Sequence, residues 1–238
     1  MPDRPSTPTL LHVGRYRVPL ETAVEVVRRY IAAPSLHDRR KPHAFDLYDA
    51  YRAENRYDPL DQPDLLAPML LGVQNLSTNA YRWLTAQIAP INEILGRIDP
   101  ETSLGDPDPD LTPLSDLFAL LDDDSPYGVR MTILSKILHR KRPHLIPLWD
   151  QHSLTCYSGG SDCPVPEQRG RSRCEYALDI TRAMHADLCT GKPLWAELTA
   201  LSAAGELTEL RALDIVAWTI GQRPELATPQ GLDVAALP

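Results

Sequence analysis

An aspartate and a run of cationic residues lie close together in the middle of this 238-residue sequence. Asp150 follows two prolines and a tryptophan, and His152 stands two residues after it. A partly buried carboxylate can stabilise positive charge that develops in a transition state and orient water for attack. An aspartate at the start of a helix can also be a capping residue, because its oxygen accepts backbone N–H groups of the first turn. The two roles are compatible, and we predict that Asp150 begins a helix and supplies the catalytic carboxylate.

The charges around Asp150 are unevenly distributed. Residues 99–124 contain nine acidic residues and no Lys or Arg, whereas residues 127–144 contain five Lys or Arg and no acid. A basic stripe could therefore bind a local anionic partner, DNA or a nucleotide, although the formal net charge is −8. The predicted phosphate contacts are Arg130, Lys136, Arg140, Lys141 and Arg142. Two structural alternatives stay open: a solvated helix face for Lys136, and interaction of residues 140–142 with the helix dipole.

The cysteines give no firm metal site. Cys156, Cys163, Cys174 and Cys189 are irregularly spaced and form no Cys-x-x-Cys pair, which is the spacing typical of zinc sites. We predict reduced thiols, no metal and no cofactor. A zinc site that includes His152 and a disulfide are the alternatives.

Composition and periodicity predict an all-α fold in a single globular domain. Aromatic residues make up only 6% of the chain, and Leu and Ala supply most of the apolar content. Apolar spacing predicts helices over 21–33, 64–73, 84–95, 113–121, 175–188, 194–203 and 207–220, with a short helix near 45–51 in a long connection. A further helix follows the turn at 125–128 and ends at 140–143, with Ile133, Leu134, Ile137 and Leu138 facing inward. We divide the chain into a flexible segment at 1–18, a helical domain at 19–222 and a proline-punctuated tail at 223–238. No apolar run is long enough to span a membrane and no signal peptide precedes the domain, so we predict a cytoplasmic protein.

Two resemblances give these residues a context. Gly128 and Val129, followed by an apolar helix and then by Pro147, Asp150 and His152, resemble the signature of the helix-hairpin-helix DNA glycosylases. That family uses a hairpin to bind DNA and an aspartate at the mouth of a base pocket. In this sequence Arg130 replaces the second hairpin glycine, one residue is inserted before the aspartate, and the spacing of the iron–sulfur cysteines is absent.

The second resemblance is to an uncharacterised bacterial helical family, a domain of unknown function, and spans Pro19 to Gly221. It rests on the pattern from Lys136 to His139, on Arg142-Pro143, on Pro147-x-x-Asp150 and on residues 211–218.

Together these resemblances imply an N-glycosylase-like protein that acts on DNA or a nucleotide. Trp149 and His152 are then candidates for stacking on a base, or are core and rim residues. Asn75 and Tyr81 lie near the turn where such folds place an intercalating side chain. The alternatives are a noncatalytic helical binding module and a small-molecule enzyme of specialised metabolism.

Overall fold

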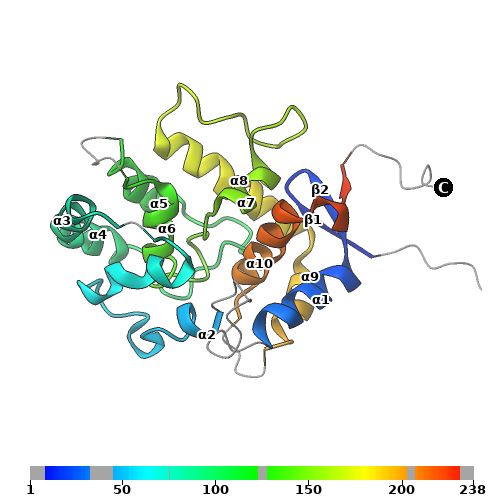
Figure 1. Cartoon of the computed structure of the whole chain (residues 1–238), viewed down its shortest axis with the longest axis horizontal. Coiled ribbons are helices and arrows are strands. Elements are labelled where there is room, and N and C mark those ends of the chain that lie inside the picture. Colours follow the sequence, from blue (N-terminus) through cyan, green and yellow to red (C-terminus); the bar gives the residue numbers. More distant parts are fainter. Residues whose placement is uncertain (1–8, 33–44, 75, 123–127, 203–206, 231–238) are drawn as a thin grey trace, which may run out of the picture.

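The computed structural model describes residues 9–32, 45–74, 76–122, 128–202 and 207–230. Most of these residues are helical, but they also include a small antiparallel sheet. The all-α prediction is therefore corrected to a mostly helical fold with a small sheet. Figure 1 shows helix α10 (Glu209–Gln222) in the middle of the molecule and the strands at one end of it.

The sheet joins the two ends of the described chain. Strands β1 (Leu10–Val13) and β2 (Tyr16–Pro19) form a hairpin, and β3 (Thr228–Pro229) pairs with β2. Leu11, Val13 and Val18 are fully buried, because alternate residues of a strand point to the same face of the sheet. The prediction of a flexible segment at 1–18 is wrong for residues 10–18, and the predicted tail contributes a strand. Each strand has four residues or fewer, which is too short for a clear alternating pattern.

The turn of the hairpin is fixed by two helices. Gly14 has a φ of +57°, and a Cβ at this position would lie 2.1 Å from the carbonyl oxygen of Cys156. Its N–H donates to Asp187 Oδ2 at 2.7 Å, and the Tyr157 hydroxyl donates to the same oxygen at 2.9 Å. Burial raises the pKa of Asp187 to about 6.

The helices follow the predicted apolar stripes. Those before the centre of the chain are α1 (Leu20–Ile31), α2 (Phe45–Tyr48), η1 (Ala53–Asn55), η2 (Pro63–Leu71), α3 (Thr78–Ala86), α4 (Ile88–Leu95) and α5 (Thr112–Ala119). The remainder are α6 (Met131–Leu138), α7 (Gln151–Tyr157), α8 (Arg173–Thr190), α9 (Lys192–Thr199) and η3 (Pro224–Leu226). The predicted inward faces of α5 and α6 are confirmed, since their apolar residues are buried. The single predicted helix over 84–95 is part of two consecutive helices, α3 and α4.

Helix η2 takes the place of the predicted helix over 64–73 but is not an α-helix. It is a 3₁₀ helix that contains Pro68, and Leu66 and Met69 are exposed. A proline inside a helix has no N–H to donate and disfavours regular α geometry. Asp64 lies within this helix and is buried, where it forms an ion pair with Lys141.

Helices α7 and α10 cross at a glycine. Gly221 of α10 lies so close to α7 that a Cβ would be 2.0 Å from the carbonyl oxygen of His152. A larger residue would therefore displace the first turn of α7. Helix α10 also packs against α1 and α9, so it connects α7 to the N-terminal half of the chain.

Candidate functional site

Asp150 is the N-cap of α7, as predicted. One carboxylate oxygen accepts a hydrogen bond from the His152 backbone N–H at 3.0 Å, and the Asp150 N–H donates to Ser153 Oγ at 2.9 Å. This reciprocal pair is a capping box. The other oxygen, Oδ2, lies 3.5 Å from Lys136 Nζ. Cap and ion pair together hold the carboxylate in one position.

The carboxylate faces a cavity of about 330 Å³, which we call the Asp150 pocket. Three residues predicted from the sequence meet there: Asp150, Lys136 and His152. The pocket is also lined by residues of α1 and α10, among them Tyr30, Arg211, Asp214 and Trp218. The Asp150 side chain is 27% exposed, so it is both fixed by the protein and open to the pocket.

A buried charge network forms one wall of the Asp150 pocket. Arg211 binds both Asp49 and Asp214, with an Nη2–Oδ2 distance of 3.0 Å to Asp49, and donates to the Tyr30 hydroxyl at 3.1 Å. Burial is the largest cause that raises the pKa of Asp214, and the nearby charge of Asp150 adds to it, giving a value of about 6. A carboxyl group with this pKa can hold a proton near neutral pH.

Aromatic rings form a second wall. The Trp218 ring meets the ring of Tyr30 edge to face, with centroids 6.3 Å apart, and meets His152 in the same way at 6.3 Å. Aromatic faces of this kind bind flat, partly polar groups such as nucleobases. The pocket therefore combines a fixed carboxylate, a second carboxyl group with a raised pKa, that of Asp214, and an aromatic surface.

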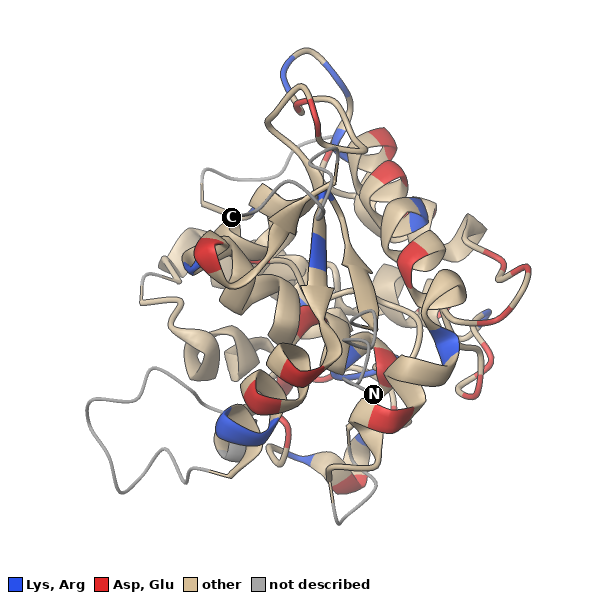
Figure 2. Ribbon diagram, turned by 90° about the vertical axis from the view of Figure 1, so that its right-hand side faces the viewer, with Lys and Arg blue, Asp and Glu red and all other residues tan. Residues whose placement is uncertain are grey.

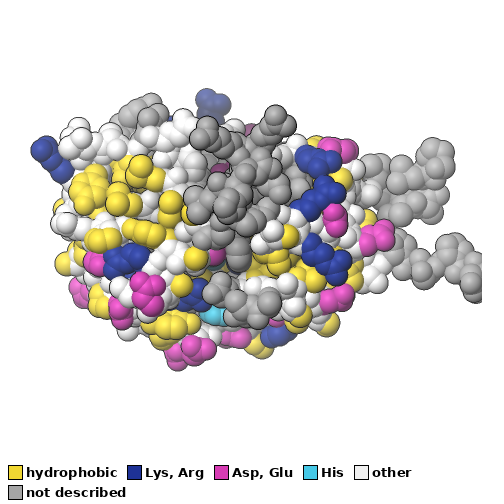
Figure 3. All heavy atoms as spheres, turned by 60° about the horizontal axis from the view of Figure 1, so that its bottom comes forward, with side chains coloured by type: hydrophobic (Ala, Val, Ile, Leu, Met, Phe, Trp, Pro, Cys, Tyr) yellow, Lys and Arg dark blue, Asp and Glu magenta, His cyan; other side chains and the backbone are white. Residues whose placement is uncertain are grey.

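The predicted basic stripe is not on the surface. Lys136, Arg140, Lys141 and Arg142, which we call the internal cations, are all buried. In Figures 2 and 3, Lys and Arg are interspersed with acidic residues, and no continuous basic band crosses the described part of either side. The prediction that these four residues form an exposed phosphate-binding stripe is therefore corrected.

The internal cations bind groups of the protein instead. Arg140 donates to the Asp49 carbonyl at 3.0 Å and lies over the Tyr48 ring. Lys141 Nζ lies 2.7 Å from Asp64 Oδ2. Arg142 donates to three backbone carbonyls, those of Leu95, Ile98 and Lys141. Burial lowers the pKa of both Arg140 and Arg142. Carbonyl groups and the C-terminal ends of helices attract cations, which explains why a basic run at the end of α6 folds inward.

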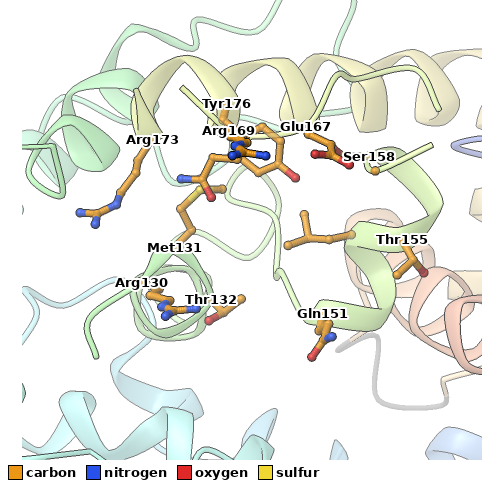
Figure 4. A pocket seen from close by; sticks show the side chains of 13 residues that line it. Arg130, Met131, Thr132, Gln151, Thr155, Ser158, Glu167, Arg169, Arg173 and Tyr176 are labelled. Atoms are coloured by element: carbon orange, nitrogen blue, oxygen red, sulfur yellow. The ribbon is translucent and has the colours of Figure 1, made fainter. Parts of the chain in front are cut away.

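Arg130 is exposed and lies in a different cavity. This cavity has a volume of about 760 Å³ and is lined by Arg130, Arg169 and Arg173, so we call it the arginine cleft. Figure 4 shows its walls, which come from the start of α6, from α7, from the start of α8 and from the loop before α8. Gln151, the residue after Asp150, lines both the arginine cleft and the Asp150 pocket.

The other predicted contacts lie elsewhere. Trp149 is 1% exposed, and its ring packs against Phe118 with centroids 4.7 Å apart, so it is a core residue and cannot stack on a base. Tyr81 packs partly buried against the hydrophobic core and lines neither cavity. Asn75 falls outside the described residues.

The cysteines form neither of the alternative sites. All four are free thiols, and Cys156 is buried with its pKa raised to about 12 by burial. Among the residues that the structure describes, no group of three or more His, Cys, Asp or Glu side chains could hold a metal ion. No helix in the same part of the chain is long and apolar enough to cross a membrane.

Sequence reasoning did not select Arg211, Asp214 and Trp218 as site residues. Their spacing of three and four places them on one face of a helix, and the stretch 211–218 was already part of the family resemblance. Asp49 was harder to find, because it follows a four-residue helix in a segment without clear periodicity.

Residues 23–221 match the model of a family of unknown function, DUF6308, and the chain belongs to this family. Neither the curated proteins nor the solved structures contain a match to the chain. The predicted membership in a domain of unknown function is confirmed. The resemblance to the helix-hairpin-helix glycosylases stays a prediction, and residues 123–127, which precede the hairpin glycine, lie outside the described part.

Proposed function

We propose that the protein hydrolyses an N-glycosidic bond in DNA or a nucleotide, with Asp150 as the catalytic carboxylate. The observation that carries this proposal is the position of Asp150, which is fixed by its cap and by Lys136 and opens into a pocket with an aromatic wall. Hydrolysis of this bond needs a preorganised negative charge near the sugar C1′, where positive charge develops in the transition state. It also needs a surface for the base, which Trp218 supplies.

Two carboxyl groups share the proton transfers of the reaction. The bond between C1′ and the base nitrogen breaks, and its electron pair leaves with the base. Asp150 stabilises the positive charge on the sugar and accepts a proton from the water whose oxygen bonds to C1′. Asp214, with its pKa raised to about 6, lines the same pocket and donates a proton to the departing base. The products are the free base and the sugar with a hydroxyl group at C1′, still bonded to its phosphate or to the DNA strand.

The test replaces Asp150 with asparagine. Asp150→Asn can still cap α7, because an amide oxygen accepts the same N–H groups, but it has no negative charge. We expect base release from nucleosides, nucleotides and damaged duplex, measured by chromatography, to fall about a hundredfold. Because Lys136 is buried, loss of its ion pair should also lower the free energy of unfolding, by about 3 kcal/mol, so base release is compared at a temperature at which both proteins are folded.

Ser153→Ala is the matched control. It removes the acceptor for the Asp150 N–H and should cost about 1 kcal/mol of stability while it leaves the carboxylate in place. Its rate of base release should stay within a few-fold of the parent rate.

A second candidate is a noncatalytic binding module, because cap and ion pair account for Asp150 without any reaction. An unchanged rate in Asp150→Asn, or no base release by the parent from any of these substrates, would favour the module.

A further inference from the structure

The arginine cleft is a second site with its own charge. Its three arginines come from different segments: Arg130 precedes α6, Arg169 lies in the loop before α8, and Arg173 begins α8. Among the described residues that line it, Glu167 is the one acidic residue. Arg130 and Arg169 form no ion pair with a described residue. A cavity with this lining attracts an anion, and arginine binds phosphate oxygens with paired N–H groups.

The arginine cleft adjoins the Asp150 pocket. Gln151 lines both cavities and directly follows Asp150 in the chain. The two cavities therefore meet at the first residue of α7, next to Asp150 in the chain. A molecule with its sugar at Asp150 could thus place an attached anionic group among the arginines.

A second groove borders the Asp150 pocket and has no excess of positive charge. This groove of about 580 Å³ between α1 and α10 shares Tyr30, Trp218 and Gln222 with the pocket. Two acidic and two basic residues line it: Glu21, Glu25, Arg29 and Arg223. A polynucleotide that continued past the pocket in this direction would therefore find no surplus of cations for its next phosphates.

We propose that the substrate is a free nucleoside 5′-monophosphate rather than duplex DNA, with its phosphate in the arginine cleft and its base against Trp218. This inference rests on the proposed function. Cations on one side of Asp150 can bind one phosphate, whereas a duplex needs cations along its length. The internal cations cannot serve that purpose, because they are buried and bound to protein groups.

The experiment compares a nucleoside with its 5′-monophosphate on the full chain. Binding is measured by calorimetry with Asp150→Asn, and base release is measured with the parent, using the common ribo- and deoxyribonucleosides and a damaged duplex. We expect the best monophosphate to bind at least tenfold more tightly than its nucleoside. The duplex should bind no more tightly than the monophosphate.

The double variant Arg130→Gln/Arg169→Gln tests the cleft directly. It leaves Arg173 in place because that guanidinium also donates to the Leu121 carbonyl and so supports the contact between α5 and α8. In both the Asp150→Asn and the parent background, the double variant should weaken monophosphate binding or raise its KM at least tenfold. The affinity and the KM for the nucleoside should not change. The control Arg97→Gln/Arg182→Gln removes the same amount of charge from exposed positions that line neither cavity. It should change the affinity for neither the nucleoside nor the monophosphate.

The outcomes separate this inference from the proposed function. The inference would be overturned if the nucleoside and the monophosphate bound with equal affinity, or if the control variant lost as much monophosphate affinity as the cleft variant. It would also be overturned if the duplex bound more tightly than the monophosphate, or if no ligand bound. If Asp150 still controls release of bases from nucleosides, the proposed function survives that result. Conversely, the monophosphate could bind through Arg130 and Arg169 without any release of base. That result would support the arginine cleft as a phosphate site and would contradict the proposed hydrolysis.

Discussion

The internal cations and the arginine cleft contain the same residue types in opposite surroundings. Lys141 and Arg142 are buried, and their donors are used by a carboxylate and by backbone carbonyls. Arg130 and Arg169 are exposed and face an open cavity. The internal cations therefore stabilise the fold, whereas Arg130 and Arg169 are available to a ligand. A basic run in a sequence indicates charge, but the partners available in the fold decide whether that charge reaches the surface.

The largest expected effect comes from Lys141→Met. The substitution leaves the Asp64 carboxylate buried without its nearest cation, and breaking a buried pair in this way costs about 3 kcal/mol or more. Urea denaturation should show this loss of unfolding free energy. The matched substitution Arg169→Gln, in the arginine cleft, should change stability by no more than about 0.5 kcal/mol.

A second substitution shows whether the buried carboxylate causes the loss. Lys141→Met/Asp64→Asn removes the buried charge that has lost Lys141 and keeps only the longer contact with Arg52 Nε, at 3.7 Å, so it should recover part of the stability. If Lys141→Met lowered the unfolding free energy as little as Arg169→Gln, the contrast between the two groups of cations would be wrong.

Arg142→Met should have a smaller effect of the same kind. Three backbone carbonyls lose their hydrogen-bond donor, including those of Leu95 and Ile98 at the end of α4. The methionine keeps much of the side-chain volume, so we expect a loss of about 2 kcal/mol from the unsatisfied carbonyls. Thermal unfolding followed by circular dichroism would measure it. Monophosphate binding by the remaining folded protein should be unchanged, and a loss of affinity comparable to that of the cleft variant would assign Arg142 to the ligand site.

The last effect depends on pH and concerns Asp187, a buried anion held by neutral donors. Its pKa is raised to about 6 from an ordinary value of 3.8, so the folded state binds the proton more tightly than the unfolded state. The resulting stabilisation is complete below about pH 4 and is lost as pH rises to about 6. Asp187→Asn keeps an oxygen for Gly14 and Tyr157 and should remove this part of the pH dependence, which is about 3 kcal/mol for a shift of this size.

Stability curves at pH 4, 5, 6 and 7 would measure this change. Asp179→Asn is the control, because Asp179 lies on the same helix but forms surface ion pairs with Arg171 and Arg182. A parent and an Asp187→Asn variant with parallel curves would contradict the assignment.

The parts that the sequence predicted best are those that depend on local patterns. Apolar spacing identified the inward faces of α5 and α6, and the residue type at position 150 predicted a helix cap. The hairpin was missed because its strands are short, and their stability comes from a contact between Gly14 and residues far away in the chain.

The site was only half predictable for a related reason. Asp150, Lys136 and His152 lie close in sequence, whereas the opposite wall comes from α1 and α10. The inward direction of residues 140–142 could not be read from spacing, because it depends on carbonyls of segments 40 or more residues away. The arginine cleft was missed in part because Arg169 and Arg173 belong to a segment with little periodicity.

The contact between Gly221 and the His152 carbonyl affects which other members of the family can be assigned the same function. A side chain at position 221 would force the first turn of α7 away from α10 and would move the Asp150 carboxylate with it. Glycine at this crossing is therefore a requirement for the pocket, although it provides no chemical group to it. Family members that retain both the aspartate and the distant glycine are expected to share the activity. Those that retain the aspartate alone have kept a helix cap, and an activity should not be transferred to them.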